Sequence, residues 1–359
     1  MIHQAGPSRL SAISQKWGEQ LICPGCGAPL QEGDAKLHCL QCRESWPIID
    51  GVPHFIEDFP YWGEIPVEQM REVTRAAQAG PWKAALLDSP DPSVQRAAGM
   101  ILNLDRANWH LLANLSPESR ILDLGAGMGA TSHALARHYR EVVAVEPVRE
   151  RVEFMQRRFA QEKLSNIKIL RSSLWTLPFA EESFDLVAMN GLLELVAEGR
   201  AGDPGELQES AVRKAFALLR PGGCLYLGIE NRICPGYFIG YPDPHCGLPF
   251  VTVLPRSLAQ WYARRKGAGV GYRNYLYSSR GYRKLLQKAG FSLVEFYLAV
   301  PSYNLPRFLI PLESDVFSYY SRNFKSTHSS RLRTLTRNFL LRLKLLKYFE
   351  YSFVILAHR

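Results

Sequence analysis

From residue 120 onward the sequence alternates short apolar runs with amphipathic helical patterns, and this alternation limits the fold more than any other feature. The apolar runs predict strands at 120–124, 141–146, 167–171, 184–189 and 223–230. Helical patterns lie between them at 131–138, 149–162 and 206–219. Strands and helices that alternate in this way are typical of a parallel sheet with helices on both faces. The sequence therefore predicts an α/β fold for this part of the chain.

The late part of this domain is interrupted by long segments. The pattern continues with a helix at 279–289 and strands at 291–300 and 348–358, so we predict one domain over 119–359. Two insertions separate these elements, at about 231–278 and 301–347. Segments of that length inside a compact domain are usually functional or form lids.

The residues before the domain fall into two parts. Residues 57–118 are predicted to be a connector and a helical cap that covers the ligand pocket, with one helix at about 93–115. Residues 19–56 hold the sequence Cys-x2-Cys, twelve further residues and a second Cys-x2-Cys. The four thiols are those of Cys23, Cys26, Cys39 and Cys42. Four thiolates at this spacing can close a tetrahedral zinc site, so we predict a small structural zinc module.

The basic residues are concentrated near the C-terminus. Between 320 and 359 there are nine Lys or Arg residues against one acidic residue, while the whole chain has a formal net charge of +9. The pattern at 331–347 predicts a helix with an apolar stripe beside a basic face, the stripe being Leu332, Leu335, Phe339, Leu343 and Leu346. Either the helix packs on the domain with its basic face in solvent, or it contacts anionic lipid or nucleic acid.

A loop with three glycines joins the first strand of the domain to the first helix. Gly125, Gly127 and Gly129 let a ligand approach the backbone, and this spacing also fits a nicotinamide-binding loop. Asp123, at the end of the strand, favours a ligand that carries an ammonium and a sulfonium over a pyrophosphate, although the residue could also cap the turn. Glu146 ends the next strand, where a carboxylate can accept hydrogen bonds from ribose hydroxyls.

Residues 120–230 resemble the class I methyltransferases in several consecutive motifs. The motifs are Ile121-Leu-Asp-Leu-Gly-Ala-Gly-Met-Gly129, Val143-Ala-Val-Glu146, Leu177-Pro-Phe179, Ser183-Phe-Asp-Leu-Val187 and Leu219-Arg-Pro-Gly-Gly223. The resemblance implies a Rossmann-like methyltransferase sheet and the donor S-adenosylmethionine. It also implies that Asp123 and the three glycines hold the methionine part of the donor and that Glu146 holds the ribose.

The resemblance assigns three more donor-binding residues. Ser173 and Leu174 would contact the adenine edge, and Asn190 would line the floor of the pocket. The family usually has Asp where this chain has Ser173, so the hydrogen bond to the adenine amino group would be weaker or come from the backbone. The cysteine segment through Trp46-Pro-Ile-Ile-Asp-Gly-Val-Pro53 resembles a zinc-ribbon-like module fused to bacterial methyltransferases, some of which modify ribosomal RNA.

Candidate catalytic residues lie in and just before the first insertion, which leaves the carboxyl end of a strand. His245 has the chemistry of a general base and Asp243 could orient it, while Glu230 and Arg232 could position substrate hydroxyls. The alternative is a proline-rich loop whose histidine is only solvated. This segment and Tyr303-Asn-Leu-Pro306 resemble methyltransferases found among bacterial surface-polysaccharide and glycolipid genes, which implies a hydroxyl acceptor.

The function predicted from the sequence is therefore O-methylation of a glycan, glycolipid or other small-molecule hydroxyl. The first alternative is an RNA methyltransferase that docks RNA through the zinc ribbon, although residues 190–193 lack the motif typical of enzymes acting on base amines. The second alternative is a non-catalytic scaffold that binds S-adenosylmethionine. No apolar run of membrane-spanning length or secretory leader is evident, so we expect a cytoplasmic protein. A further expectation is peripheral contact of the basic helix with the inner membrane face.

Overall fold

The computed structural model describes residues 17, 20–313, 315–323 and 331–359, without the side chains of 331–334 and 336. The chain divides into two compact units. The first unit comprises Met1–Ala107 and Leu115–Phe184, and the second comprises Asn108–Asn114 and Asp185–Arg359.

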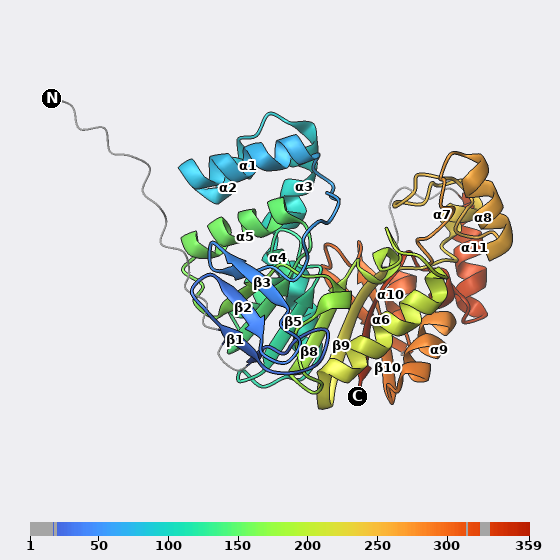
Figure 1. Cartoon of the computed structure of the whole chain (residues 1–359). Coiled ribbons are helices and arrows are strands. Elements are labelled where there is room, and N and C mark those ends of the chain that lie inside the picture. Colours follow the sequence, from blue (N-terminus) through green and yellow to red (C-terminus); the bar gives the residue numbers. More distant parts are fainter. Residues whose placement is uncertain (1–16, 18–19, 314, 324–330) are drawn as a thin grey trace. The chain divides into compact units, whose positions relative to one another are not determined.

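The first unit begins with a small antiparallel sheet in the order β1-β2-β3-β4 (Figure 1). Its strands are β1 (Leu30–Glu32), β2 (Lys36–Cys39), β3 (Ser45–Ile49) and β4 (Val52–Pro53). The turn between β3 and β4 is made by Asp50 and Gly51, both with positive φ, which is the conformation of a tight hairpin turn. This sheet is held to the rest of the unit by backbone hydrogen bonds, including one from the Ile22 amide to the Pro178 carbonyl of 2.9 Å.

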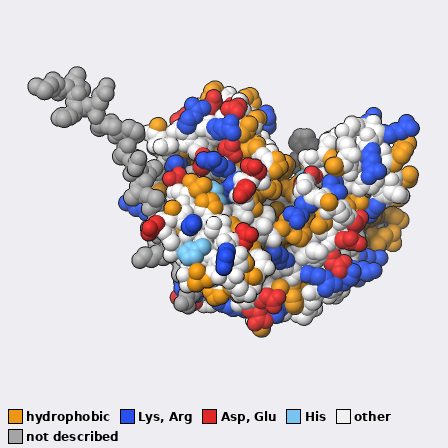
Figure 2. Space-filling model, viewed as in Figure 1, with side chains coloured by type: hydrophobic (Ala, Val, Ile, Leu, Met, Phe, Trp, Pro, Cys, Tyr) orange, Lys and Arg blue, Asp and Glu red, His pale blue; other side chains and the backbone are white. Residues whose placement is uncertain are grey.

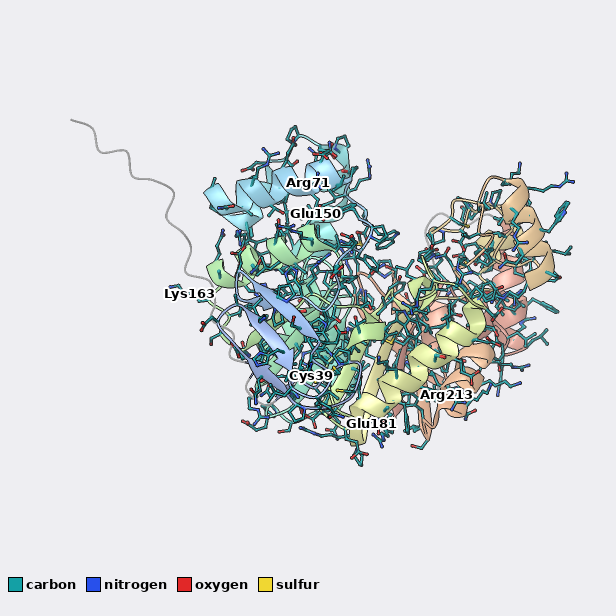
Figure 3. All side chains as sticks on the ribbon, viewed as in Figure 1. Cys39, Arg71, Glu150, Lys163, Glu181 and Arg213 are labelled. Carbon is teal, nitrogen blue, oxygen red and sulfur yellow. The ribbon has the colours of Figure 1, made fainter. Side chains whose placement is uncertain are left out.

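Helices follow the small sheet. They are α1 (Val67–Ala79), α2 (Trp82–Leu87) and α3 (Pro92–Leu102), and their apolar faces form one buried cluster with Met128 and Phe154. Figure 1 shows α1 and α2 lying over α5 (Arg149–Gln161). The Arg71 guanidinium of α1 donates to the Glu150 carboxylate of α5 at 2.9 Å, and Figure 3 shows the two side chains facing each other.

The prediction of a single helix at 93–115 is wrong. Helix α3 ends at Leu102, Asn103 adopts an extended conformation, and a separate 3₁₀ segment, η2, spans Leu104–Leu112. The Asn103 side chain accepts a hydrogen bond from the Asp105 amide, a local interaction that competes with helix continuation. Leu111, which lies within the range of the predicted helix, is 72% exposed.

The main sheet of the first unit is parallel, as predicted. Its strands are β5 (Arg120–Leu124), β6 (Glu141–Val145) and β7 (Ile167–Leu170), in the order β5-β6-β7. They are connected by α4 (Ala130–Ala136) and α5, and η3 (Leu174–Thr176) follows β7. All five side chains of β5 are buried, including the charged side chains of Arg120 and Asp123, as in a strand that is covered on both faces.

The second unit contains five further strands in the order β11-β10-β12-β9-β8. They are β8 (Phe184–Asn190), β9 (Leu219–Glu230), β10 (Leu293–Val300), β11 (Phe308–Pro311) and β12 (Ser352–His358), where β8 starts at the unit boundary. The last strand, β12, pairs antiparallel with both β9 and β10, so the final residues of the chain complete the sheet. The remaining elements of this part are η4 (Leu193–Leu195), α6 (Pro204–Leu218) and α9 (Ser279–Ala289). The prediction of a Rossmann-like α/β fold is confirmed.

Both predicted insertions contain regular structure. The first includes α7 (Pro235–Phe238) and α8 (Arg256–Arg265), and the second includes β11, α10 (Asp315–Asn323) and α11 (Arg331–Arg342), followed by η5 (Leu346–Tyr348). The first insertion has a local apolar core, formed by the buried side chains of Val251, Ala259, Ala263, Tyr272 and Tyr275. The exact domain boundaries that the sequence suggested stay predictions.

The apolar stripe predicted for the C-terminal basic helix is only partly buried. Leu335, Phe339 and Leu343 are exposed, whereas Leu346 is buried, and Leu332 lies outside the described side chains. Basic and acidic side chains are interspersed on the face of the molecule seen in Figure 2. Among the described helices, none is long and apolar enough to cross a bilayer. Contact of α11 with lipid or nucleic acid stays a prediction.

Candidate functional site

The glycine loop between β5 and α4 has the backbone geometry that its sequence implies. Gly125, Gly127 and Gly129 all have positive φ, between +58° and +76°. At Gly129 a Cβ atom would lie 2.5 Å from Cζ of Phe159 and 3.0 Å from Cγ of Met155. Only glycine fits both the backbone conformation and the space at this position. The loop therefore presents bare backbone where a ligand is predicted to approach.

Asp123 is buried at the carboxyl end of β5. Its Oδ2 accepts a hydrogen bond of 2.6 Å from the Ser132 hydroxyl on α4, and burial raises the pKa of Asp123 to about 6. A desolvated carboxylate is stabilised by a nearby cation, so this position suits the ammonium group of a ligand.

Glu146 fixes the glycine loop to the end of β6. Its Oε2 accepts a hydrogen bond of 2.8 Å from the Gly127 amide, and its Oε1 accepts one of 3.1 Å from the Val148 amide. Burial raises the pKa of this carboxyl, while the Arg151 guanidinium opposes that shift. Because a carboxylate offers about four lone pairs, these two bonds leave capacity for ribose hydroxyls, the role that we predict.

Ser173 has a local structural function that the sequence analysis did not anticipate. Its hydroxyl accepts a hydrogen bond from the Trp175 amide, and the Thr176 hydroxyl accepts one from the Ser173 amide, so the pair forms a capping box at η3. Such a cap explains a serine at this place without any ligand. Leu174 is buried beside it. Contact of these two residues with adenine stays a prediction.

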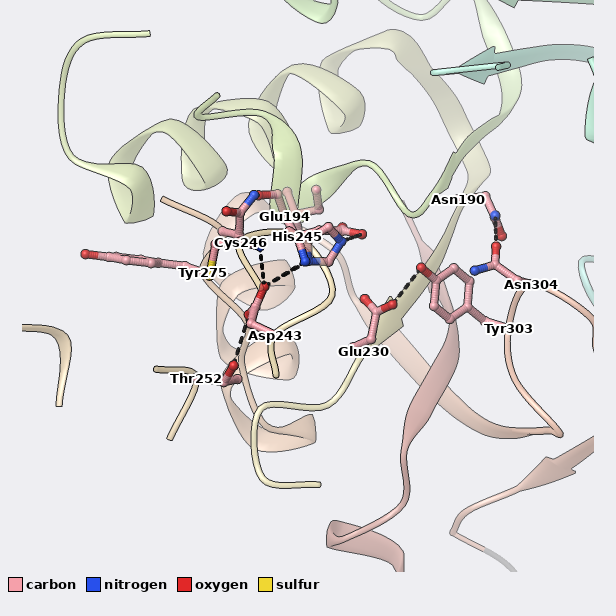
Figure 4. Close-up of polar contacts among 12 residues, drawn as sticks. Asn190, Glu194, Glu230, Asp243, His245, Cys246, Thr252, Tyr275, Tyr303 and Asn304 are labelled. Atoms are coloured by element: carbon pink, nitrogen blue, oxygen red, sulfur yellow. Dashed lines mark hydrogen bonds and ion pairs between the residues drawn. The ribbon is translucent and has the colours of Figure 1, made fainter. Parts of the chain in front are cut away.

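Asn190 ends β8 in the second unit. Its Oδ1 accepts a hydrogen bond of 2.6 Å from the Tyr226 hydroxyl. Its Nδ2 donates to Oδ1 of Asn304 at 3.1 Å, as Figure 4 shows. The Tyr226 ring stacks on Trp109 with centroids 3.5 Å apart. The amide of Asn190 is therefore held in one orientation, and its predicted place in the donor pocket stays a prediction.

The four cysteines of the first unit are brought together. The sulfur atoms of Cys23 and Cys42 are 3.5 Å apart, and those of Cys26 and Cys39 are 3.4 Å apart. All four sulfur atoms lie within 4.8 Å of one another. Zinc–sulfur bonds of about 2.3 Å in a tetrahedron separate the sulfurs by roughly 3.8 Å. The arrangement therefore fits a single tetrahedral ion.

A second polar cluster lies wholly within the second unit, and it joins the predicted catalytic residues. Glu230 ends β9, and His245 and Asp243 lie in the first insertion, as expected. Glu194 of η4 joins them, and the sequence analysis missed it. Its Oε1 is 3.5 Å from Nε2 of His245, and Oδ1 of Asp243 is 3.5 Å from Nδ1 of the same ring (Figure 4). The histidine is therefore not part of a merely solvated loop.

The carboxylates of this cluster are deeply buried. Glu194 is 0% exposed and Glu230 is 5% exposed. Among the residues that the structure describes, neither side-chain oxygen of Glu194 has a hydrogen-bond partner, and Oε2 of Glu230 has none either. The other oxygen of Glu230 accepts a hydrogen bond of 2.9 Å from the Tyr303 hydroxyl. Buried polar atoms without partners are rare in proteins and require an explanation.

The charges in the cluster shift each other's protonation. Burial and the nearby Glu194 carboxylate raise the pKa of Glu230 to about 7. Burial alone would lower the pKa of His245, but the carboxylates of Asp243 and Glu194 raise it to about 10. An imidazole in that state is a hydrogen-bond donor at neutral pH, so the arrangement does not favour His245 as the group that accepts a proton.

Asp243 is anchored from several sides. Its carboxylate accepts hydrogen bonds from the Thr252 hydroxyl at 2.9 Å, the Tyr272 hydroxyl at 3.0 Å and the His245 amide at 2.9 Å. It can therefore hold the imidazole in place, and its orienting role in catalysis stays a prediction. The Arg232 guanidinium instead donates to the carbonyl oxygens of Thr252 and Leu254, so its observed contacts stabilise the insertion.

Comparison with known proteins identifies the catalytic domain. Residues 121–223 match a family model described as a methyltransferase domain. An uncharacterized methyltransferase of Bacillus subtilis, YcgJ, is 37% identical over 76 residues, which are 21% of this chain and 30% of the relative. A ubiquinone biosynthesis O-methyltransferase of Coxiella burnetii is 29% identical over 150 residues, which are 39% of this chain and 60% of the relative. The matches thus span less than two thirds of these relatives.

Solved structures of similar proteins were also found. The crystal structure of YcgJ from Bacillus subtilis has a TM-score of 0.41 and 15% identity, covering 71% of this chain and 97% of that protein. The crystal structure of the [4+2]-cyclase SpnF has a TM-score of 0.45 and 16% identity, covering 82% of this chain and 94% of that protein.

Residues 121–223 of this chain thus form a methyltransferase domain. The motifs that predicted the domain lie within the matched residues, and the prediction is confirmed for that domain. The nicotinamide-binding alternative for the glycine loop has no support from the family match.

The titration of Asp123 predicts how donor binding depends on pH. We expect the affinity for S-adenosylhomocysteine, measured by calorimetry, to fall as the pH decreases from 7 to 5, because a carboxyl with a pKa of about 6 loses its charge in this range and no longer attracts the ammonium group. Asp123→Asn should weaken binding by about tenfold or more, on the order of 1.4 kcal/mol, and should remove most of the pH dependence.

Glu146→Gln is the matched control, because Glu146 is buried next to the same loop. That variant should retain a decrease in affinity between pH 7 and 5. An Asp123→Asn variant that binds S-adenosylhomocysteine as tightly as the wild type would contradict the assigned role.

Proposed function

We propose that this protein transfers the methyl group of S-adenosylmethionine to a hydroxyl oxygen of a small molecule, glycan or glycolipid. The observation that carries the proposal is a pair of buried glutamates, Glu194 of η4 and Glu230 at the carboxyl end of β9. In the described part of the chain, three of their four oxygens have no hydrogen-bond donor. In α/β folds this end of the strands is where ligands bind.

A hydroxyl acceptor needs a group that takes its proton. In the transfer, the sulfur–methyl bond of the donor breaks as the oxygen–methyl bond forms, and the hydroxyl proton leaves to a nearby base. Oε2 of Glu194, which has no hydrogen-bond partner among the described residues, can accept a hydrogen bond from the acceptor and then its proton. Amine acceptors make less demand on a base, so two buried carboxylates favour the hydroxyl.

His245 serves a different purpose in this proposal from the one that the sequence suggested. Its ring lies between Asp243 and Glu194, where both nitrogens face carboxylate oxygens. We therefore assign the proton acceptor to a glutamate, with His245 and Asp243 positioning the cluster. The name of the Coxiella burnetii relative, an O-methyltransferase, supports a hydroxyl acceptor, although that relative matches only 39% of this chain.

The acceptor is tested with donor that carries a labelled methyl group. Full-length protein is given hydroxyl compounds (catechols, phenyl glycosides and a bacterial glycolipid extract), amines, or ribosomal RNA fragments in separate reactions. We expect the label in a hydroxyl compound as an ether. Glu230→Gln, which keeps an oxygen for the Tyr303 hydroxyl, should lower this transfer by about a hundredfold or more while donor affinity is retained.

Glu295→Gln is the matched control, because Glu295 also lies beside a histidine, His358, but on β10 outside the cluster. It should transfer at the wild-type rate. Label in RNA would support the RNA methyltransferase alternative, for which one relative is named a probable ribosomal RNA methyltransferase. Donor binding without transfer in any reaction would support the non-catalytic scaffold.

The proposal includes a structural zinc ion on Cys23, Cys26, Cys39 and Cys42, whose sulfur separations suit it. Zinc would stabilise a module that is too small to fold on an apolar core alone, since such ions contribute about 10–16 kcal/mol of apparent binding free energy. We also place the enzyme in the cytoplasm, where thiols stay reduced.

Metal analysis tests the zinc site directly. Protein purified under reducing conditions should hold zinc in the ribbon, and Cys26→Ser should lose it and lower the melting temperature. Cys246→Ser is the control, because Cys246 is a free cysteine of the second unit outside the ribbon. Zinc content that is equal in the wild type and Cys26→Ser would contradict the assignment.

A further inference from the structure

We propose that Glu194, Glu230 and His245 bind a divalent first-row transition-metal cation. The metal site itself stands on the geometry of these side chains. Its use in catalysis, to hold the acceptor hydroxyl, rests on the function proposed above.

The three side chains are already arranged as ligands. One ligand atom from each residue can be chosen so that all three lie within 4.8 Å of one another. Metal–oxygen and metal–nitrogen bonds of about 2.0–2.2 Å place the ligands of one ion roughly 3 to 4.4 Å apart, depending on the angle between them. A cation between the side chains therefore needs only small rotations.

The cluster also contains more carboxylates than positive groups. Three buried carboxylates, those of Glu194, Glu230 and Asp243, surround a single imidazole. In the described part of the chain, neither glutamate forms an ion pair with a lysine or arginine, and three of their four oxygens have no hydrogen-bond partner. Buried charges are normally paired or bound to metal. A divalent cation would supply both the missing charge and the missing partners.

The surroundings of the three ligands match those of known metal sites. A metal-binding histidine usually donates its other ring N–H to a carboxylate, which fixes the ring. Nε2 of His245 faces Glu194 and would bind the cation after it releases its proton, because a histidine ligand is neutral, while Nδ1 faces Asp243 at 3.5 Å. Asp243 is in turn held by Thr252 and Tyr272. The Tyr303 hydroxyl binds one oxygen of Glu230 and leaves the other, Oε2, free for a metal.

The donor set limits the choice of ion and of acceptor. An imidazole with two carboxylates suits Mn²⁺, Fe²⁺ or Zn²⁺, whereas the four thiolates of the ribbon favour Zn²⁺. Three protein ligands leave coordination positions open for substrate. A metal-bound hydroxyl loses its proton more readily, as metal-bound water does. We therefore infer an acceptor with two adjacent oxygen atoms, such as a catechol or a vicinal diol, that chelates the ion.

The test is equilibrium dialysis of zinc-loaded, full-length protein against Mn²⁺, followed by elemental analysis, with no donor or acceptor present. Wild-type protein should retain one cation beyond the zinc of the cysteines. Glu194→Gln and Glu230→Gln should each weaken Mn²⁺ binding at least tenfold. Asp243→Asn, which leaves all three ligands in place, should weaken it about 10- to 100-fold.

Glu295→Gln is the matched control and should bind Mn²⁺ as the wild type does. Circular dichroism identifies any of the three cluster variants that fails to fold. Mn²⁺ binding is then compared between the wild type and the remaining two variants. Wild-type protein that holds no cation beyond the ribbon zinc, or equal Mn²⁺ binding in the wild type and the folded variants, would overturn the proposal. Because the measurement needs no methyl transfer, a failure of the O-methyltransferase proposal would leave Mn²⁺ binding unchanged.

Discussion

The hydrogen bonds of the buried Arg158 guanidinium are the interactions on which the glycine loop and the helices around it depend. It lies in α5 with 0% exposure, and its Nη1 donates to the carbonyl oxygens of Met128 at 3.0 Å and Ile101 at 3.1 Å. Its Nε faces Nδ1 of His133 on α4, and the group stacks over the Trp82 ring at 4.3 Å. One side chain thus joins the glycine loop, the end of α3, α4 and α2. Burial lowers the pKa of Arg158 to about 9, so the side chain remains a cation at neutral pH. Its hydrogen bonds therefore have a charged donor, which makes them stronger than neutral ones.

The buried charges of the second unit have fewer hydrogen bonds. Among the described residues, Nε and Nη1 of Arg158 donate hydrogen bonds and only Nη2 has no acceptor, whereas three of the four carboxylate oxygens of Glu194 and Glu230 have no hydrogen-bond donor. A buried polar group without a hydrogen-bond partner lowers the stability of the folded state by about 1–3 kcal/mol, and a charged group lowers it by more. Three carboxylate oxygens without a hydrogen-bond donor in the described chain are the reason for the proposal that a ligand binds at this cluster. The glycine loop has the geometry that the proposed donor requires, and the cluster supports the proposed hydroxyl acceptor.

Much of the fold could be predicted from the sequence because its signals are local. The apolar runs of β5 and β6, the glycines with positive φ and the helix at 279–289 are each determined by neighbouring residues. The break at Asn103 was missed because one side-chain hydrogen bond interrupts an otherwise helical pattern. Glu194 and Arg158 were missed for another reason. Each acts through residues far away in the sequence, and only the folded chain brings those partners together. The one local signal was an acidic residue within the apolar run around Leu193 and Leu195.

The central claim is that the loop after β5 binds a sulfonium donor and that this donor supplies the chemistry of the chain. Isothermal titration calorimetry of the full-length protein with S-adenosylmethionine, and separately with NADH, tests it most directly. The account predicts saturable binding of S-adenosylmethionine with one site per chain and no measurable heat from NADH. Saturable binding of NADH without binding of S-adenosylmethionine would contradict it.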